Sequence, residues 1–89
     1  MKVAYRKLFL KELHSLRHTD VYGRIKELLF ETLPDSQALS EVAGVKSLRQ
    51  SKNAFRIRLG EYRIGLKMKG DLIEVMRVLH RKDFYRYFP

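Results

Sequence analysis

Apolar and basic residues alternate in the second half of the chain, over residues 55–59 and again over residues 62–68. Alternation with a period of two predicts β-strands that pack one face and expose the other. Gly60-Glu61 separates the two runs, and glycine at the first position favours a two-residue type II′ hairpin turn. The resulting register places Arg58 opposite Arg63. Because like charges opposite one another are unfavourable, this pair suggests that a polyanion binds across it.

A second hairpin follows, with its turn at Gly70-Asp71 and a returning strand over residues 72–79. A two-residue turn places Lys67 opposite Glu74, and this favourable cross-strand pair supports the register. Both faces of the returning strand are rather apolar, which is typical of a central strand covered on both sides.

The same register predicts the two faces at the end of the returning strand. It places His80 on the face of Arg56, Arg58 and Arg63. It places Arg77 on the opposite, apolar face, where we interpret this arginine as structural, either snorkelling or paired with a carboxylate.

The first half of the chain predicts a short edge strand over residues 2–5 and two helices. Apolar residues recur at helical spacing from Arg6 to Leu16 and from Val21 to Leu33. Thr19 or Asp20 is the expected N-cap of the second helix, which is expected to end at Leu33-Pro34. Residues 35–53 predict one short helical turn and a packed loop.

Aromatic and basic residues interleave in the C-terminal stretch, residues 80–89. Phe84 and Phe88 are four residues apart and are expected to anchor a last helical turn. Tyr85 then points elsewhere, back over the basic face.

Composition narrows the class of protein. Eighty-nine residues predict a single domain, residues 1–89, with a modest core. The absence of cysteine excludes disulfides and cysteine-based zinc sites, and we expect no metal or other cofactor. No apolar run approaches the ~20 residues that span a bilayer. The N-terminus lacks the apolar stretch of a signal peptide, so we expect a cytoplasmic protein without membrane contact.

The net charge of +9 is concentrated in the second half. Residues 1–45 contain seven Lys or Arg and six Asp or Glu, whereas residues 46–89 contain twelve and four. Nearly all the excess charge therefore lies with the hairpins. A concentrated basic face is typical of a protein that binds nucleic acid or an acidic protein partner.

The residue types on this face also fit RNA cleavage. Arginine forks bind phosphate oxygens, aromatic rings stack on unpaired bases, and His80 and Tyr85 can transfer protons. In such a reaction the ribose 2′-OH attacks the adjacent phosphate while the arginines stabilise the developing charge. The residues alone favour binding of RNA or an acidic protein over cleavage.

Two segments resemble the RelE/ParE superfamily of bacterial toxins: FRIRLGEYRI at residues 55–64 and RVLHRKDFY at residues 77–85. The order of elements is also similar: a strand, a helical hairpin, a three-stranded antiparallel sheet and a basic-aromatic tail. The resemblance implies an α+β fold of the microbial-ribonuclease (RelE-like) type, with the N-terminal strand and helical hairpin packed on a small antiparallel sheet. It also implies a type II toxin whose partners are an acidic RelB-like antitoxin, messenger RNA and the ribosome.

RelE-type members cleave messenger RNA in the ribosomal A site without a metal. The resemblance assigns this role to Arg63, His80, Arg81 and Tyr85 as catalytic residues. Further contacts with RNA or phosphate are expected from Arg56, Arg58, Lys67 and Lys82.

RelE itself has lysines where this chain has Arg56 and Arg58. Because arginine cannot act as a general base, the base is His80, Tyr85, an unidentified group or one supplied by the ribosomal substrate. Two other functions stay open. One is a ParE-like toxin that inhibits DNA gyrase without cleaving RNA, and the other is an inactive member that only binds an antitoxin.

Overall fold

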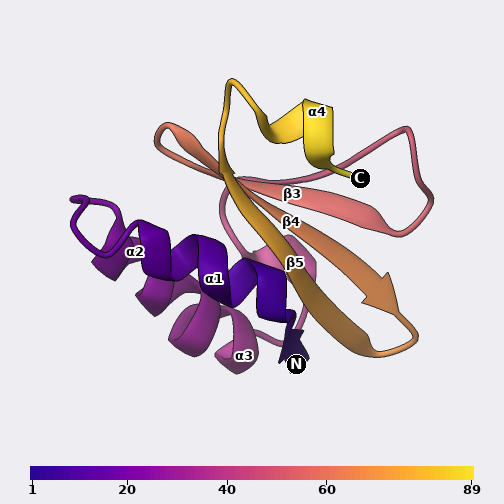
Figure 1. Cartoon of the computed structure of the whole chain (residues 1–89). Helices are drawn as coiled ribbons and strands as arrows, with labels where there is room; N and C mark the ends of the chain where they lie inside the picture. The colour runs from indigo at the N-terminus through magenta and orange to yellow at the C-terminus, as the bar shows by residue number, and fades with distance from the viewer.

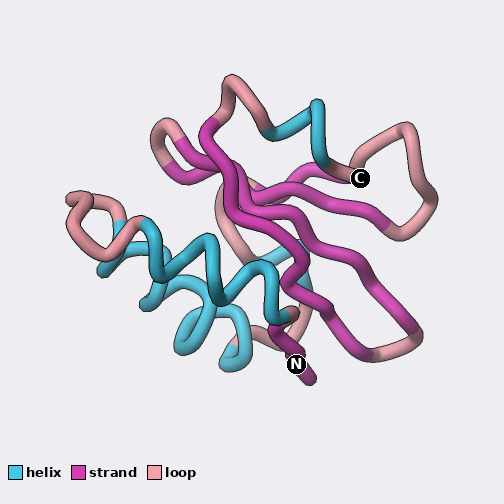
Figure 2. The backbone as a smooth tube through the Cα atoms, viewed as in Figure 1, coloured by secondary structure: helices cyan, strands magenta, loops and turns pink.

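A five-stranded β-sheet organises the chain, and the computed structural model describes all 89 residues. The strands lie in the order β1-β5-β4-β3-β2, with β1 parallel to β5 and every other pair antiparallel. The helices of the first half cover one face, and a short C-terminal helix lies on the other (Figures 1 and 2). The elements are β1 Lys2–Tyr5, α1 Lys7–Ser15, α2 Tyr22–Glu27, η1 Leu28–Thr32, α3 Leu33–Asp35, η2 Leu39–Glu41, β2 Val45–Ser47, β3 Ala54–Leu59, β4 Tyr62–Lys69, β5 Leu72–His80 and α4 Phe84–Tyr87. The predicted α+β class is confirmed.

The β3–β4 hairpin has the predicted register. Arg58 pairs with Arg63 and Leu59 with Tyr62 across the turn. A type II′ turn requires a positive φ at its first central residue and a negative φ at its second. Gly60 has φ of +59°, and Glu61, like every other non-glycine residue, does not have a positive φ. Alternation and one glycine were therefore sufficient to determine this hairpin.

The larger core lies between the helical layer and one face of the sheet. Each helix contributes one apolar stripe, and each central strand contributes alternate residues. Fourteen buried side chains form it: Phe9, Leu13, Val21, Ile25, Leu29, Leu33, Leu39, Val42, Ile57, Ile64, Leu66, Ile73, Val75 and Val78.

The second helical segment continues one residue beyond the predicted end at Leu33-Pro34, to Asp35. Its middle part, η1, is a π-helix, in which hydrogen bonds run from residue i to i+5. Proline has no N–H and crowds the carbonyl one turn earlier, and the wider π turn relieves this conflict. Leu29 lies five residues before Pro34, and its carbonyl instead accepts the Tyr5 hydroxyl at 2.5 Å. Burial raises the pKa of Tyr5, so this donor stays protonated.

The predicted N-cap of the second helix was wrong. Val21 occupies the N-cap position and makes no side-chain capping bond. The Thr19 hydroxyl donates instead to the Leu16 carbonyl at 2.7 Å, and so closes the turn that follows α1.

The loop predicted over residues 35–53 contains an unpredicted strand. After the expected short helical turn, η2, residues Val45–Ser47 form β2 at the edge of the sheet beside β3. Three residues are too short for an alternation pattern to identify a strand.

A β-bulge in β5 overturns the faces predicted for the end of that strand. Before the bulge along β5, Glu74 pairs with Lys67 as expected. After it, Arg77 pairs with Gly65, so that Met76 is an extra residue without a partner on β4. The extra residue moves every later side chain to the other face. Arg77 therefore shares the face of Arg56, and His80 pairs with Tyr62 rather than lying on the arginine face.

Glu12 on α1 holds this irregular part of β5. Its carboxylate accepts Arg77 Nη2 at 2.7 Å and Arg77 Nε at 3.0 Å, and it also accepts the Val78 backbone N–H at 3.1 Å. The pairing of β5 with β1 ends at Val75. Glu12 therefore accepts a hydrogen bond from a backbone N–H of β5 that β1 does not reach. The structural role predicted for Arg77 is confirmed, with Glu12 as its carboxylate. The hydrogen bond to Glu12 is the largest cause of the raised pKa of Arg77.

The helix α4 packs on the arginine face of the sheet and covers part of it. Phe84 and Phe88 are buried against Leu48 and Ala54, as the predicted anchoring requires. A Cβ on Gly65 would lie 2.9 Å from three atoms of the Phe88 ring. Glycine at this position therefore allows α4 to lie close to β4.

The contact between Gly65 and Phe88 predicts the effect of one methyl group. We expect Gly65→Ala to lower the free energy of unfolding by about 1–3 kcal/mol, because the ring must move away from the sheet. Urea denaturation measures this, and adding Phe88→Leu should restore part of the loss. Gly23→Ala is the control, since a Cβ there meets nothing within 4 Å, and it should cause no loss. An unchanged stability of Gly65→Ala would contradict the close packing.

The Glu12–Arg77 pair predicts a larger effect than a surface ion pair. Both side chains are mostly buried, with exposures of 16% and 20%, so Glu12→Gln should lower the free energy of unfolding by about 1–3 kcal/mol. The control is Asp71→Asn, which breaks the Lys2–Asp71 pair of 75% and 80% exposed side chains and should cost less than about 0.5 kcal/mol. Equal losses in urea denaturation would contradict a special role for Glu12.

Candidate RNA-binding site

The uncovered part of the arginine face lies on the β3–β4 hairpin. Arg58 and Arg63 are directly paired, and Arg56 pairs with Gly65 one step along the same face. On the outer side Arg56 pairs with Lys46 of β2. The sheet thus presents a continuous group of four cations without an intervening side-chain carboxylate.

Arg63 lies at the centre of this group. Burial lowers the pKa of Arg63, and the nearby charges of Arg58, Arg56 and Arg81 lower it further, while Tyr85 acts in the opposite direction. Its Nη1 donates to the carbonyls of Gly60 at 2.8 Å and Tyr62 at 2.9 Å, which fixes the guanidinium against the turn. The remaining N–H groups can donate to an incoming anion.

The loop before β2 holds the outer arginines. Arg56 Nη1 donates to the Gly44 carbonyl at 2.6 Å, and the Arg58 backbone N–H donates to the same oxygen at 3.0 Å. Gly44 has φ of +84°, and a Cβ there would lie 2.7 Å from the Arg58 carbonyl oxygen. The position therefore requires glycine for both its conformation and its close approach to β3.

Arg81 and Tyr85 form the rim next to the turn. The Arg81 backbone N–H donates to the Glu61 carbonyl at 2.8 Å, and Arg81 Nε lies 3.1 Å from Glu61 Oε2. Tyr85 is 56% exposed, while its helix is anchored by the buried Phe84 and Phe88. The charges of Arg81 and Tyr85 both affect the pKa of Arg63, and on this ground we place them at the rim of the arginine group.

His80 is the last residue of β5, and Lys82 lies in the turn that follows. The His80 ring packs edge-on against Tyr62 with centroids 5.5 Å apart, and its Nδ1 accepts the Lys82 backbone N–H at 3.1 Å. The second contact assigns the ring proton of neutral His80 to Nε2. Lys82 is exposed on the same turn. Neither residue is part of the group around Arg63.

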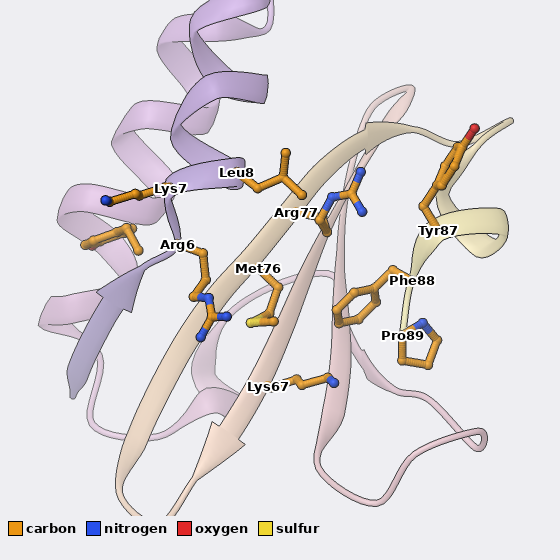
Figure 3. Close-up of a pocket in the computed structure, with 10 residues that line it drawn as sticks. Arg6, Lys7, Leu8, Lys67, Met76, Arg77, Tyr87, Phe88 and Pro89 are labelled. Carbon is orange, nitrogen blue, oxygen red and sulfur yellow. The ribbon is translucent and has the colours of Figure 1, made fainter.

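Lys67 is separated from the arginines. Arg63, Gly65 and Lys67 alternate on one face of β4, and the Phe88 ring covers Gly65 between them. Lys67 instead lines a cavity on the other side of α4 (Figure 3).

Two basic residues that the sequence reasoning missed join the group. Lys46, on β2, and Arg49, two residues after the end of this strand, line a cavity of about 200 Å³ with Tyr85. Recognition of β2 would have placed Lys46 opposite Arg56, but no local signal in the sequence identified that strand. The cavity lies beside an exposed aromatic ring, an arrangement that suits a nucleobase stacked on Tyr85.

The chain is similar along its whole length to toxin RelE3 of Methanocaldococcus jannaschii, with 43% identity over 91 residues and complete coverage of both chains. The chain belongs to the RelE family of toxins. No family model matches it.

Solved structures of RelE-type toxins have the same fold. The RelB–RelE antitoxin–toxin complex from Methanococcus jannaschii matches with a TM-score of 0.75 and 35% identity, over 97% of this chain and 99% of the other. YafQ from E. coli matches with a TM-score of 0.70 and 19% identity, over 91% and 93%. The predicted superfamily and its RelE-like fold are therefore confirmed. No helix of the structure combines the length and apolar character needed to span a membrane.

The like charges around Arg63 predict that removing one of them stabilises the free protein. We expect Arg58→Gln to raise the free energy of unfolding by about 0.2–1 kcal/mol at low ionic strength. The gain should shrink as added salt shortens the Debye length from ~30 Å at 0.01 M towards ~3 Å at 1 M. Arg24→Gln, on the exposed face of α2, is the matched control and should show no such gain. A loss of stability in Arg58→Gln would contradict the repulsion.

Proposed function

We propose that this RelE-family toxin is a ribosome-dependent endoribonuclease that cleaves messenger RNA and so inhibits translation. The observation that carries the proposal is the convergence of Arg56, Arg58, Arg81 and Tyr85 around Arg63. A ribosomal substrate implies a cytoplasmic protein. The two hydrophobic clusters lie on opposite faces of one sheet, and this supports residues 1–89 acting as a single domain.

The arginines would hold the scissile phosphate. Arg58 is exposed, and Arg63 lies half-buried beside it with its guanidinium fixed to the turn. Donors fixed in place stabilise the charge that develops on phosphate oxygens without reorganising during the reaction. Arg81, held by Glu61, would contribute a further cation from the rim. The repulsion that these cations experience in the free protein is relieved when an anion binds.

The reaction needs two proton transfers and no metal. The 2′-oxygen forms a bond to the adjacent phosphorus and the bond from phosphorus to the 5′-oxygen breaks, leaving a 2′,3′-cyclic phosphate and a 5′-hydroxyl. The 2′-OH proton leaves to a base, and the departing 5′-oxygen gains a proton. We assign the second transfer to Tyr85, which is exposed and lines a cavity together with Lys46 and Arg49.

We assign His80 and Lys82 a positioning role instead of a role in proton transfer or phosphate binding. The acceptor His80 Nδ1 shapes the turn that carries Arg81, and the ring packs on Tyr62, away from the arginine face. Lys67 is also left out of the RNA site because α4 lies between it and the arginines.

The relatives indicate the partner of this toxin. The structure from Methanococcus jannaschii is an antitoxin–toxin complex of RelB and RelE, and another similar structure is the toxin–antitoxin complex RelBE2 of Mycobacterium tuberculosis, at 23% identity and a TM-score of 0.68. We propose a RelB-like antitoxin of acidic character as the partner here, because the toxin has a net charge of +9.

Induced expression of single-site variants tests the proposed roles. We expect Arg63→Gln and Tyr85→Phe each to lower the rate of messenger RNA cleavage by about 10²-fold or more, the usual cost of losing one stabilising donor or one proton carrier. His80→Asn keeps a side-chain acceptor and should retain most activity. Cleavage is measured by mapping RNA 5′ ends in translating cells.

Tyr87→Phe is the matched control for Tyr85→Phe, since Tyr87 is similarly exposed on the same short helix, but its ring lies beside Arg77, with the centroid 5.7 Å from the guanidinium. It should cleave as the wild type does. Uncut messenger RNA on expression of the wild type would overturn the proposal, and loss of DNA supercoiling in the same cells would indicate a gyrase inhibitor.

A further inference from the structure

The turn that follows β5 carries Arg81 on the way from the sheet to α4 (Figure 1). Three hydrogen bonds hold the backbone of this turn. The Arg81 N–H donates to the Glu61 carbonyl at 2.8 Å. The Lys82 N–H donates to His80 Nδ1 at 3.1 Å, and the Asp83 N–H donates to the His80 carbonyl at 2.9 Å. Of the three acceptors, only His80 Nδ1 takes up a proton near neutral pH, so the turn depends on one titratable atom.

The hydrogen bond from Lys82 exists only while His80 is neutral. A neutral imidazole with its proton on Nε2 offers Nδ1 as an acceptor, whereas an imidazolium carries a proton on both nitrogens. Protonation of His80 therefore places a second donor opposite the Lys82 N–H. It also adds a positive charge directly before Arg81 and Lys82 in the chain. Both changes disfavour the turn that the structure shows.

The surroundings of His80 do not compensate for the lost hydrogen bond. His80 takes part in none of the ion pairs of the chain, and its ring packs edge-on against the Tyr62 ring. Two carboxylates on neighbouring elements are already engaged, Glu61 by Arg81 at 3.1 Å and Glu12 by Arg77 at 2.7 Å. The other charged groups on the packed segments are Lys82 and Asp83 on the turn itself, and Asp20 and Arg24, which line a cavity with Tyr62 and Glu61.

The position of Arg81 relies on the backbone of the turn. The Arg81 and Glu61 side chains are 55% and 61% exposed, and an ion pair with that exposure contributes little on its own. The turn therefore has to keep the guanidinium beside the arginine group of the sheet, where its charge affects Arg63.

We propose that His80 is a positioning residue that makes the RNA site sensitive to pH. While His80 is neutral, the turn holds Arg81 at the rim of the arginine group. When His80 is protonated, the turn loosens, Arg81 leaves the rim and cleavage slows. The inference rests on the proposed function for the part that Arg81 plays in cleavage. It adds a form of regulation to that site, the loss of activity on acidification.

Nuclear magnetic resonance of the purified full-length protein tests the turn without RNA. We expect the signals of the Lys82 amide and the Arg81 Nε–H to shift together from about pH 7.5 to about pH 5.5, within the range in which histidines titrate. In His80→Asn both signals should stay constant, because the side-chain oxygen keeps the acceptor and does not titrate. The control is His14→Asn, which removes an exposed histidine of α1 and should leave both shifts as in the wild type.

Cleavage on programmed ribosomes at the same two pH values tests the consequence. We expect the wild type to slow at least about fivefold more than His80→Asn on acidification, a comparison that cancels the titration of the ribosome. His80→Phe keeps a ring beside Tyr62 but has no acceptor, so it should be slow at both pH values. In an Arg81→Gln background, His80→Asn should no longer change the pH profile, because the two residues act through one contact.

Three results would overturn the inference. The Lys82 and Arg81 signals do not shift with pH in the wild type, His80→Asn keeps the pH profile of the wild type, or His80→Asn loses about 10²-fold in rate at about pH 7.5, as a proton carrier would. If the wild type cuts no messenger RNA at either pH, the proposed function fails. The resonance titration still decides whether His80 controls the position of Arg81.

Discussion

The bulge at Met76 is the constraint on which both faces of the sheet depend. Val75, before the bulge, and Val78, after it, both face the helical layer. The one extra residue therefore keeps the core continuous along a twisted strand. The same residue turns Arg77 and Leu79 towards α4 and His80 away from it. Glu12 satisfies the backbone and the arginine just past the bulge. Met76 and Leu79 pack against the cluster in which Phe84 and Phe88 anchor α4.

The arginine face concentrates like charges, which oppose the stability of the free protein. Arg58 lies opposite Arg63, and the pKa of Arg63 is lowered by burial and by three neighbouring arginines. Such a cluster destabilises a free sheet and gains favourable interactions only when an anion binds. On the other side of α4, by contrast, Arg6 and Arg77 are paired with Glu74 and Glu12. Phe88 thus divides the face into the hairpin arginines Arg56, Arg58 and Arg63, which form no ion pair, and a region in which Arg6 and Arg77 are paired with carboxylates.

The order and spacing of neighbouring residues predicted those features that depend on interactions close in the sequence. Alternation and Gly60 gave the β3–β4 register, and the spacing of Phe84 and Phe88 gave the anchored last helix. Features set by distant contacts were missed. Nothing near Met76 signals a bulge that responds to sheet twist and to Glu12, so His80 was placed on the wrong face. The strand β2 was too short to recognise, and Lys46 was missed with it. Of the expected site, Arg56, Arg58, Arg63, Arg81 and Tyr85 are gathered by the structure, while Lys67, His80 and Lys82 lie outside the group.

The central claim is that the cluster around Arg63 promotes attack of a ribose 2′-OH on its own phosphate. The most direct measurement uses purified toxin and ribosomes programmed with a defined messenger RNA, with or without a 2′-O-methyl group at the nucleotide that is cut. The account predicts a cut that leaves a 2′,3′-cyclic phosphate, and no cut at the methylated nucleotide. Equal cleavage of both messages would contradict it, because the methylated ribose has no hydroxyl with which to attack.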